Sequence, residues 1–177
     1  MIIITAKKKK VDLEDEIEIL KKIRHELKNN KIAAEICKEY DFDLDIIDGI
    51  PIDFEEDLEA SAKTVDSRII LSFKLIDEEF DIIMRYAIHE LVHALQHMRS
   101  VGSSKHKSQE YLDQKDELEA FQYQVKFDAK ERGLDKAKEY VEELVDYHKI
   151  PRNKAKGKKR ELLNKAIWLP ITSSSIK

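Results

Sequence analysis

The sequence is poor in the residues that interrupt or cross-link a chain. Four glycines and three prolines among 177 residues argue against a β-sandwich, a collagen-like chain or a Pro/Gly-rich disordered segment. The single cysteine, Cys37, excludes an intramolecular disulfide, and there is no CxxC motif or Cys/His cluster to bind a metal through thiolates. The chain also lacks any apolar run near the roughly 20 residues that span a bilayer.

The N-terminal residues do not resemble a secretory signal peptide. Three isoleucines come first and the lysines of residues 7–10 follow them, which is the reverse of the order in such a signal. We therefore expect a cytoplasmic protein without a membrane-spanning segment. Because 42% of the residues are hydrophobic and the length suits one domain, we expect residues 1–177 to fold as a single unit.

Charged residues make up 38% of the chain and are unevenly distributed along it. Residues 35–59 contain eleven acidic side chains and one lysine, whereas residues 149–165 contain eight basic side chains and one glutamate. We interpret residues 149–177 as a basic C-terminal helix and tail appended to the domain.

The spacing of apolar residues predicts a mainly helical α+β protein, with a small antiparallel sheet packed on one of the helices. Residues 41–49 alternate acidic and apolar side chains and are predicted as a strand or turn, since Ile46 and Ile52 stand where a calcium loop needs Gly and Glu. The predicted helices cover residues 12–27, 32–40, 78–98, 114–132, 134–148 and 157–168, and the predicted strands cover residues 2–5, 64–65 and 68–73.

The strongest chemical signal is the HExxH motif formed by residues 89–93, inside a predicted helix. Residues four apart share a helix face, so His89 and His93 can direct imidazole nitrogens at one zinc ion while Glu90 reaches an adjacent water. His97 lies one further turn, about 6 Å, along the helix axis. We therefore expect His97 to lie outside the ligand set.

Zinc catalysis requires a third protein ligand and an open position. Two glutamates of the predicted helix 114–132 compete for this role. At about 100° per residue, Glu117 falls within the apolar arc, where an unpaired carboxylate is costly unless a metal binds it. Glu119 falls on the far side, as a solvated partner for Lys126 or Lys115, and is the alternative third ligand.

These motifs carry a family resemblance. HELVH at 89–93, followed by Glu117-Leu-Glu-Ala120, resembles the gluzincin class of zinc metallopeptidases, and in particular the small single-domain members found in phages and bacteria. The resemblance covers residues 63–127. It implies a zincin-like fold, in which the edge strand before the active-site helix corresponds to residues 68–73. It also implies that His89, His93 and Glu117 bind Zn²⁺ and that Glu90 is the general base.

One position departs from the family pattern, because Phe121 follows the motif alanine where many relatives carry Asp or Asn. The hydrogen bond that orients a histidine ligand must then come from elsewhere, with Gln124, Asp128 and a backbone carbonyl as candidates. A donor to the oxyanion of the tetrahedral intermediate is also expected. The candidates are Tyr123 and His106, together with Tyr111, Tyr86 and His148.

The resulting hypothesis is a metallopeptidase that hydrolyses a peptide or protein substrate, with the peptide pairing to the strand around residues 69–72. One alternative is a zinc-stabilised regulatory or interaction protein without catalysis. A second is nucleic-acid binding through the basic residues between Arg152 and Arg160. No aromatic residue is interleaved there, which favours a solvated helix end or a contact with the acidic region of the chain.

Overall fold

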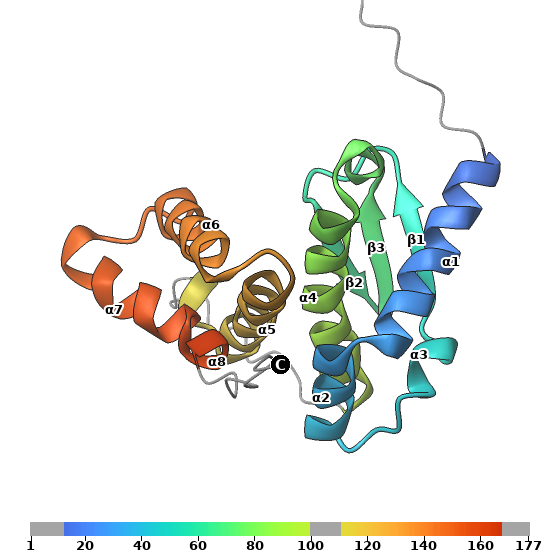
Figure 1. Ribbon diagram of the computed structural model, residues 1–177, viewed down its shortest axis with the longest axis horizontal. Coiled ribbons are helices and arrows are strands. Elements are labelled where there is room, and N and C mark those ends of the chain that lie inside the picture. The colour runs from blue at the N-terminus through green and yellow to red at the C-terminus, as the bar shows by residue number, and fades with distance from the viewer. Residues whose placement is uncertain (1–12, 100–110, 168–177) are drawn as a thin grey trace, which may run out of the picture.

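The computed structural model describes residues 13–99 and 111–167, which form a mainly helical α+β protein (Figure 1). The predicted fold class is confirmed. His106 and the predicted strand 2–5 lie outside the described residues. The helices are α1 (Leu13–Asn29), α2 (Lys31–Glu39), α3 (Ile46–Gly49), α4 (Phe80–Met98), α5 (Lys115–Glu131), α6 (Leu134–Tyr147), α7 (Arg152–Leu162) and α8 (Asn164–Ile167), with 3₁₀ turns η1 (Phe73–Asp77) and η2 (Tyr111–Asp113), and the strands are β1 (Ile52–Glu55), β2 (Ala62–Val65) and β3 (Arg68–Ser72).

The sheet has the order β1-β3-β2 and is mixed, which corrects the prediction of an antiparallel sheet. β2 and β3 form an antiparallel hairpin around Asp66 and Ser67, whose positive φ angles of 49° and 63° match the tight turn that such a hairpin needs. β1 pairs with the other edge of β3 in parallel, with Ile52 opposite Ile69. β3 is therefore the central strand, and β2 is the edge strand beside α4.

Residues 41–49, predicted as a strand or turn, end instead in the short helix α3, and the strand begins after Pro51. Arg24 of α1 fixes the position of this segment through hydrogen bonds. Its guanidinium donates to the backbone carbonyls of Ile47 and Ile50, the second at 2.9 Å, and so satisfies groups at the end of α3. The acidic residues of this segment lie at the surface, as the alternation suggested.

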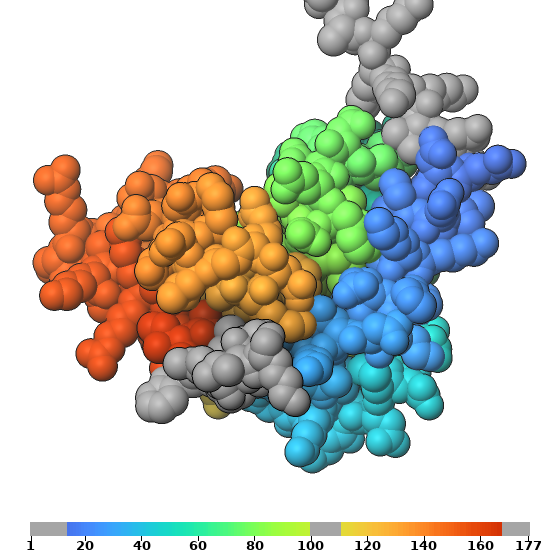
Figure 2. Space-filling model, in the orientation of Figure 1, coloured from blue at the N-terminus to red at the C-terminus, as the bar shows by residue number. Residues whose placement is uncertain are grey.

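Two hydrophobic cores share one helix. The first lies between α1, α2, the sheet and α4, and the second between α5, α6, α7 and α8. α5 contributes to both, since Tyr123 and Phe127 belong to the first core and Phe121 and Val125 to the second. In Figure 1, α5 lies between α4 and the C-terminal helices. In the space-filling view, the two parts of the molecule meet where α4 and α5 pack together (Figure 2).

The basic C-terminal helices pack against the rest of the protein through apolar residues. Leu162 is fully buried and Ala166 is 4% exposed, both in the second core. Several of the basic side chains bind acids of the same chain, for example Lys159 to Glu142 at 3.0 Å and Lys165 to Glu39 at 3.1 Å. Within residues 13–99 and 111–167, no helix has both the length and the hydropathy of a membrane span.

We predict that Leu162→Ala lowers the free energy of unfolding by about 2–5 kcal/mol, because it leaves a cavity in the second core. Ile167→Ala serves as the matched control, since Ile167 is 59% exposed and its truncation should change stability by less than about 0.5 kcal/mol. Urea denaturation monitored by circular dichroism measures both. Equal, small effects would show that α7 does not stabilise the fold.

Candidate metal centre

Three side chains from α4 and α5 converge on one point. The Nε2 atoms of His89 and His93 lie 3.1 Å apart, and Glu117 Oε2 lies 3.7 Å from the first and 3.4 Å from the second. Helix periodicity explains the arrangement, because His89 and His93 are one turn apart on α4 and α5 packs along that face. The three residues can hold a metal ion, as predicted.

A glutamine orients each histidine. His89 Nδ1 donates to Gln124 Oε1 and His93 Nδ1 donates to Gln96 Oε1, both at 2.8 Å. An amide oxygen only accepts hydrogen bonds, so each imidazole carries its proton on Nδ1. In the neutral form of each imidazole, Nε2 therefore presents a lone pair toward Glu117, which is the tautomer that a metal ligand needs.

Gln124 is one of the candidates proposed to replace the missing Asp or Asn, and the structure places it on His89. Phe121, the residue at the departing position, packs edge-on against the His89 ring with centroids 4.5 Å apart. Asp128, the other side-chain candidate, is instead fully buried beside Arg85 and Arg132, at 3.6 and 3.2 Å. The hydrogen bond to Gln124 and the edge contact with Phe121 thus both hold the His89 ring in place.

The electrostatics of the metal-free site follow from the burial of Glu117. Burial alone would raise the pKa of this carboxyl, but the adjacent imidazoles of His89 and His93 and the nearby Tyr111 hydroxyl hold its pKa well below its usual range. For His93, burial acts to lower the pKa, and the carboxylates of Glu117 and Glu90 outweigh it and raise the pKa to about 9. Without metal, His93 and Glu117 therefore form a buried ion pair. Among the described residues, Glu117 Oε2 accepts no hydrogen bond of good geometry, which leaves it available to a metal.

Glu90 is buried next to the three ligands, with 5% of its surface exposed. The hydroxyl of Thr64, on edge strand β2, lies 2.8 Å from Glu90 Oε2 and donates to it. This contact fixes the carboxylate and leaves its second oxygen, Oε1, unbound by the strand.

A cavity of about 530 Å³ opens beside the metal ligands and is bounded by α4, α5, α6 and the segment before β2. His89 and Glu90 form part of its wall. Tyr111 and His148, two of the expected oxyanion donors, also line it and stack on each other with ring centroids 5.2 Å apart. Burial lowers the pKa of His148, so its imidazole is neutral near pH 7. Tyr86 lines the same cavity.

Tyr123 does not reach this cavity, which corrects one predicted role. It lies about 240° around α5 from Glu117, on the side that faces the first core. Its hydroxyl donates to Glu39, and its ring is fully buried under Lys165. His97 is exposed on α4, outside the metal-binding group, in agreement with the expectation.

The environment predicted for Glu119 is also wrong. The helix geometry is right, since Glu119 points away from the metal ligands, but α2 and α8 cover that side of α5. Glu119 accepts hydrogen bonds from Tyr40 at 2.6 Å and from Gln96 at 3.3 Å, while Lys126 pairs with Glu35. Because Gln96 also orients His93, Glu119 supports the metal site from a distance instead of ligating.

Sequence reasoning missed two residues of the site, Gln96 and Thr64. Gln96 lies three residues after His93 on the same helix, so its spacing is a signal that could have identified it. Thr64 has no such signal. Its position beside Glu90 depends on how the edge strand packs on α4, which is a tertiary contact.

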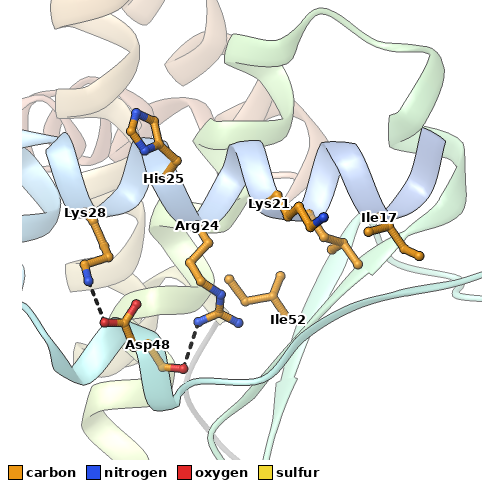
Figure 3. Close-up of a pocket in the computed structure, with 8 residues that line it drawn as sticks. Ile17, Lys21, Arg24, His25, Lys28, Asp48 and Ile52 are labelled. Atoms are coloured by element: carbon orange, nitrogen blue, oxygen red, sulfur yellow. Dashed lines mark hydrogen bonds and ion pairs between the residues drawn. The ribbon is translucent and has the colours of Figure 1, made fainter. Parts of the chain in front are cut away.

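A second hollow, of about 380 Å³, lies between α1 and the chain around α3 and β1 (Figure 3). The polar side chains that line this hollow form contacts between α1 and the segment around α3. Arg24 donates to the backbone carbonyl of Asp48 and Lys28 donates to the Asp48 carboxylate, as the dashed lines in Figure 3 show. No group of metal ligands lines it among the described residues. Among the described residues, the group that can hold a metal ion therefore lies at the junction of α4 and α5.

Comparisons with models of known protein families, with curated proteins and with solved structures gave no match.

We predict that Glu117→Ala loses the bound metal and that Glu119→Ala keeps one ion per chain, because only Glu117 lies beside both Nε2 atoms. Elemental analysis of protein loaded with zinc and then desalted measures the content. Metal retained in Glu117→Ala but lost in Glu119→Ala would instead assign the third ligand to Glu119.

We also predict that metal binding at pH 7 releases about one proton per ion, because His93 is protonated below its pKa of about 9 and must be neutral to ligate. The apparent affinity should rise about tenfold per pH unit up to pH 9 and then level off. Calorimetric titrations in buffers of different ionisation enthalpy measure the released proton. A titration at pH 7 without buffer dependence would contradict the His93–Glu117 ion pair.

Proposed function

We propose that this protein is a zinc-dependent metallopeptidase. The observation that carries the proposal is the convergence of His89, His93 and Glu117 beside a buried Glu90 at the wall of a cavity. The resemblance of the two motifs to gluzincins supports the same conclusion. Structural zinc sites are usually closed by four protein ligands, whereas catalytic sites have three and an open position.

Zinc suits this donor set. Two imidazole nitrogens and one carboxylate oxygen are common zinc ligands, with bonds of about 2.0–2.1 Å. In a tetrahedron with such bonds the ligand atoms are about 3.3–3.4 Å apart. The separations of 3.1, 3.4 and 3.7 Å between the three atoms are close to this value. A small side-chain adjustment is therefore enough to bind the ion.

A zinc ion bound by these residues supplies Lewis acidity toward the substrate carbonyl and an activated water near neutral pH. Glu90 acts as the general base. Thr64 holds Oε2, so Oε1 accepts the proton of the attacking water. The same oxygen then delivers this proton to the amine that leaves when the peptide bond breaks. Its burial excludes bulk water, which strengthens the electrostatic interactions of the carboxylate.

We expect the substrate backbone to bind along β2. β3 is paired on both sides, so the predicted pairing of peptide to residues 69–72 is excluded, and β2 is the edge strand that lies against α4. A peptide added to β2 by main-chain hydrogen bonds passes next to Thr64 and Glu90. Tyr111 and His148 line the cavity and are the residues best placed to donate to the oxyanion.

The two alternatives receive less support. A purely structural zinc would not require a buried general base held by Thr64 at the wall of an open cavity. Nucleic-acid binding through α7 would compete with contacts inside the protein, since Lys158 binds Asp113 at 2.6 Å and Lys159 binds Glu142.

We predict that Glu90→Ala keeps one zinc per chain and lowers the rate of peptide hydrolysis by about 10²–10⁴-fold, because the general base is lost while the ligands remain. Cleavage of a fluorogenic peptide mixture measures the rate, and elemental analysis measures the metal. Glu78→Ala is the control, because Glu78 is an exposed acid before α4 and outside the cavity. Unchanged hydrolysis in Glu90→Ala would refute this mechanism.

A further inference from the structure

Five phenylalanine and tyrosine side chains line the cavity beside the metal ligands. Tyr86, Tyr111, Phe121, Tyr140 and Tyr147 line it, and they come from α4, η2, α5 and α6. Phe121 and Tyr140 are each 7% exposed, whereas Tyr147 is 80% exposed, so the lining runs from a buried floor to an open rim. A volume of about 530 Å³ is large enough for one long side chain of a bound peptide.

The charge of the lining has one sign. Glu59, in the connection before β2, and Glu143, on α6, line the cavity, and no lysine or arginine does so among the described residues. Both carboxylates are exposed to solvent. They come from separate parts of the fold that border the same opening. A positively charged group that enters the cavity therefore lies near carboxylates on two of its walls.

The nearby cation Arg85 does not alter this balance. Its guanidinium packs over the Tyr140 ring, 3.9 Å from the centroid, and pairs with the buried Asp128 at 3.6 Å. Arg85 is 8% exposed and is not part of the cavity wall. The contact also shows that a tyrosine ring of this wall binds a guanidinium through a cation–π interaction.

We propose that this cavity binds a lysine or arginine side chain of the substrate, next to the bond that is cleaved. The inference rests on the proposed peptidase function, since the cavity shares His89 and Glu90 with the metal centre. The aliphatic stem of the side chain packs on the aromatic walls, and its charged end lies near Glu59 and Glu143. An acidic side chain in the same place is repelled by both carboxylates.

The first test is a cleavage profile of a proteome-derived peptide library by the zinc-loaded protein, with products sequenced by mass spectrometry. Lysine and arginine together should be enriched about tenfold over acidic residues at one position adjacent to the cleaved bond. The enrichment should decrease at high salt, because both carboxylates are exposed to solvent. Cleavage without this enrichment would overturn the inference and leave the peptidase proposal intact.

Variants that neutralise Glu59 and Glu143 test whether this cavity causes the preference for lysine and arginine. The pair Glu59→Gln/Glu143→Gln should lose most of the tenfold enrichment while still cleaving peptides. The matched pair Glu139→Gln/Glu142→Gln, which removes the same charge from α6 outside the cavity, should keep it. Enrichment that survives in the first pair would overturn the assignment to this cavity.

A binding measurement separates this inference from the peptidase proposal. Two fluorescein-labelled peptides, identical except for one lysine or one glutamate in a neutral sequence, are titrated with zinc-loaded Glu90→Ala protein. The lysine peptide should bind about tenfold more tightly by fluorescence anisotropy, and Glu59→Gln/Glu143→Gln should remove the difference. If the wild type cleaves nothing but this difference is found, the peptidase proposal fails and the cation site stands. Equal binding of the two peptides overturns the cation site.

Discussion

The burial of one carboxylate, Glu117, is the constraint on which the arrangement of this protein depends. A buried charge is costly unless a partner compensates it, and here the partners are the imidazoles of His89 and His93. They come from α4, so α4 and α5 must pack in a single register. The sheet and α1 support α4 from one side, and the C-terminal helices support α5 from the other.

A layer of neutral amides surrounds the ligands. Gln124 and Gln96 orient the two imidazoles without adding negative charge, whereas carboxylates in these places would push electron density onto the metal. On the side of His93 the hydrogen bonds continue beyond the amides. Gln96 also donates to Glu119, and Glu119 accepts a hydrogen bond from Tyr40 at the C-terminal end of α2. These hydrogen bonds connect His93 to Tyr40, a residue of the first hydrophobic core.

The predictions that agree with the structure about which side chains lie together relied on helix periodicity. The HExxH residues share a face because four residues make about one turn, and the choice of Glu117 over Glu119 followed from the same arithmetic. The predictions that failed concerned which residues pack against a given face of a helix. Glu119 points away from the ligands as expected but meets Tyr40 instead of solvent, and Tyr123 was taken for a site residue although its face turns toward Glu39. β1 was missed because its pairing with β3 joins segments separated by a hairpin strand.

The sequence by itself determined the helical class, the helix that carries the HExxH motif and the likeness of its two motifs to a zinc peptidase, because these depend on contacts within one or two turns of a helix. Only the tertiary structure decided which glutamines orient the histidines, that Thr64 holds Glu90, and that β2 is the edge strand. It also decided that Glu59 and Glu143, far apart in the chain, border one cavity. Such contacts depend on how the two cores pack around α5, and no local spacing of residues encodes that packing.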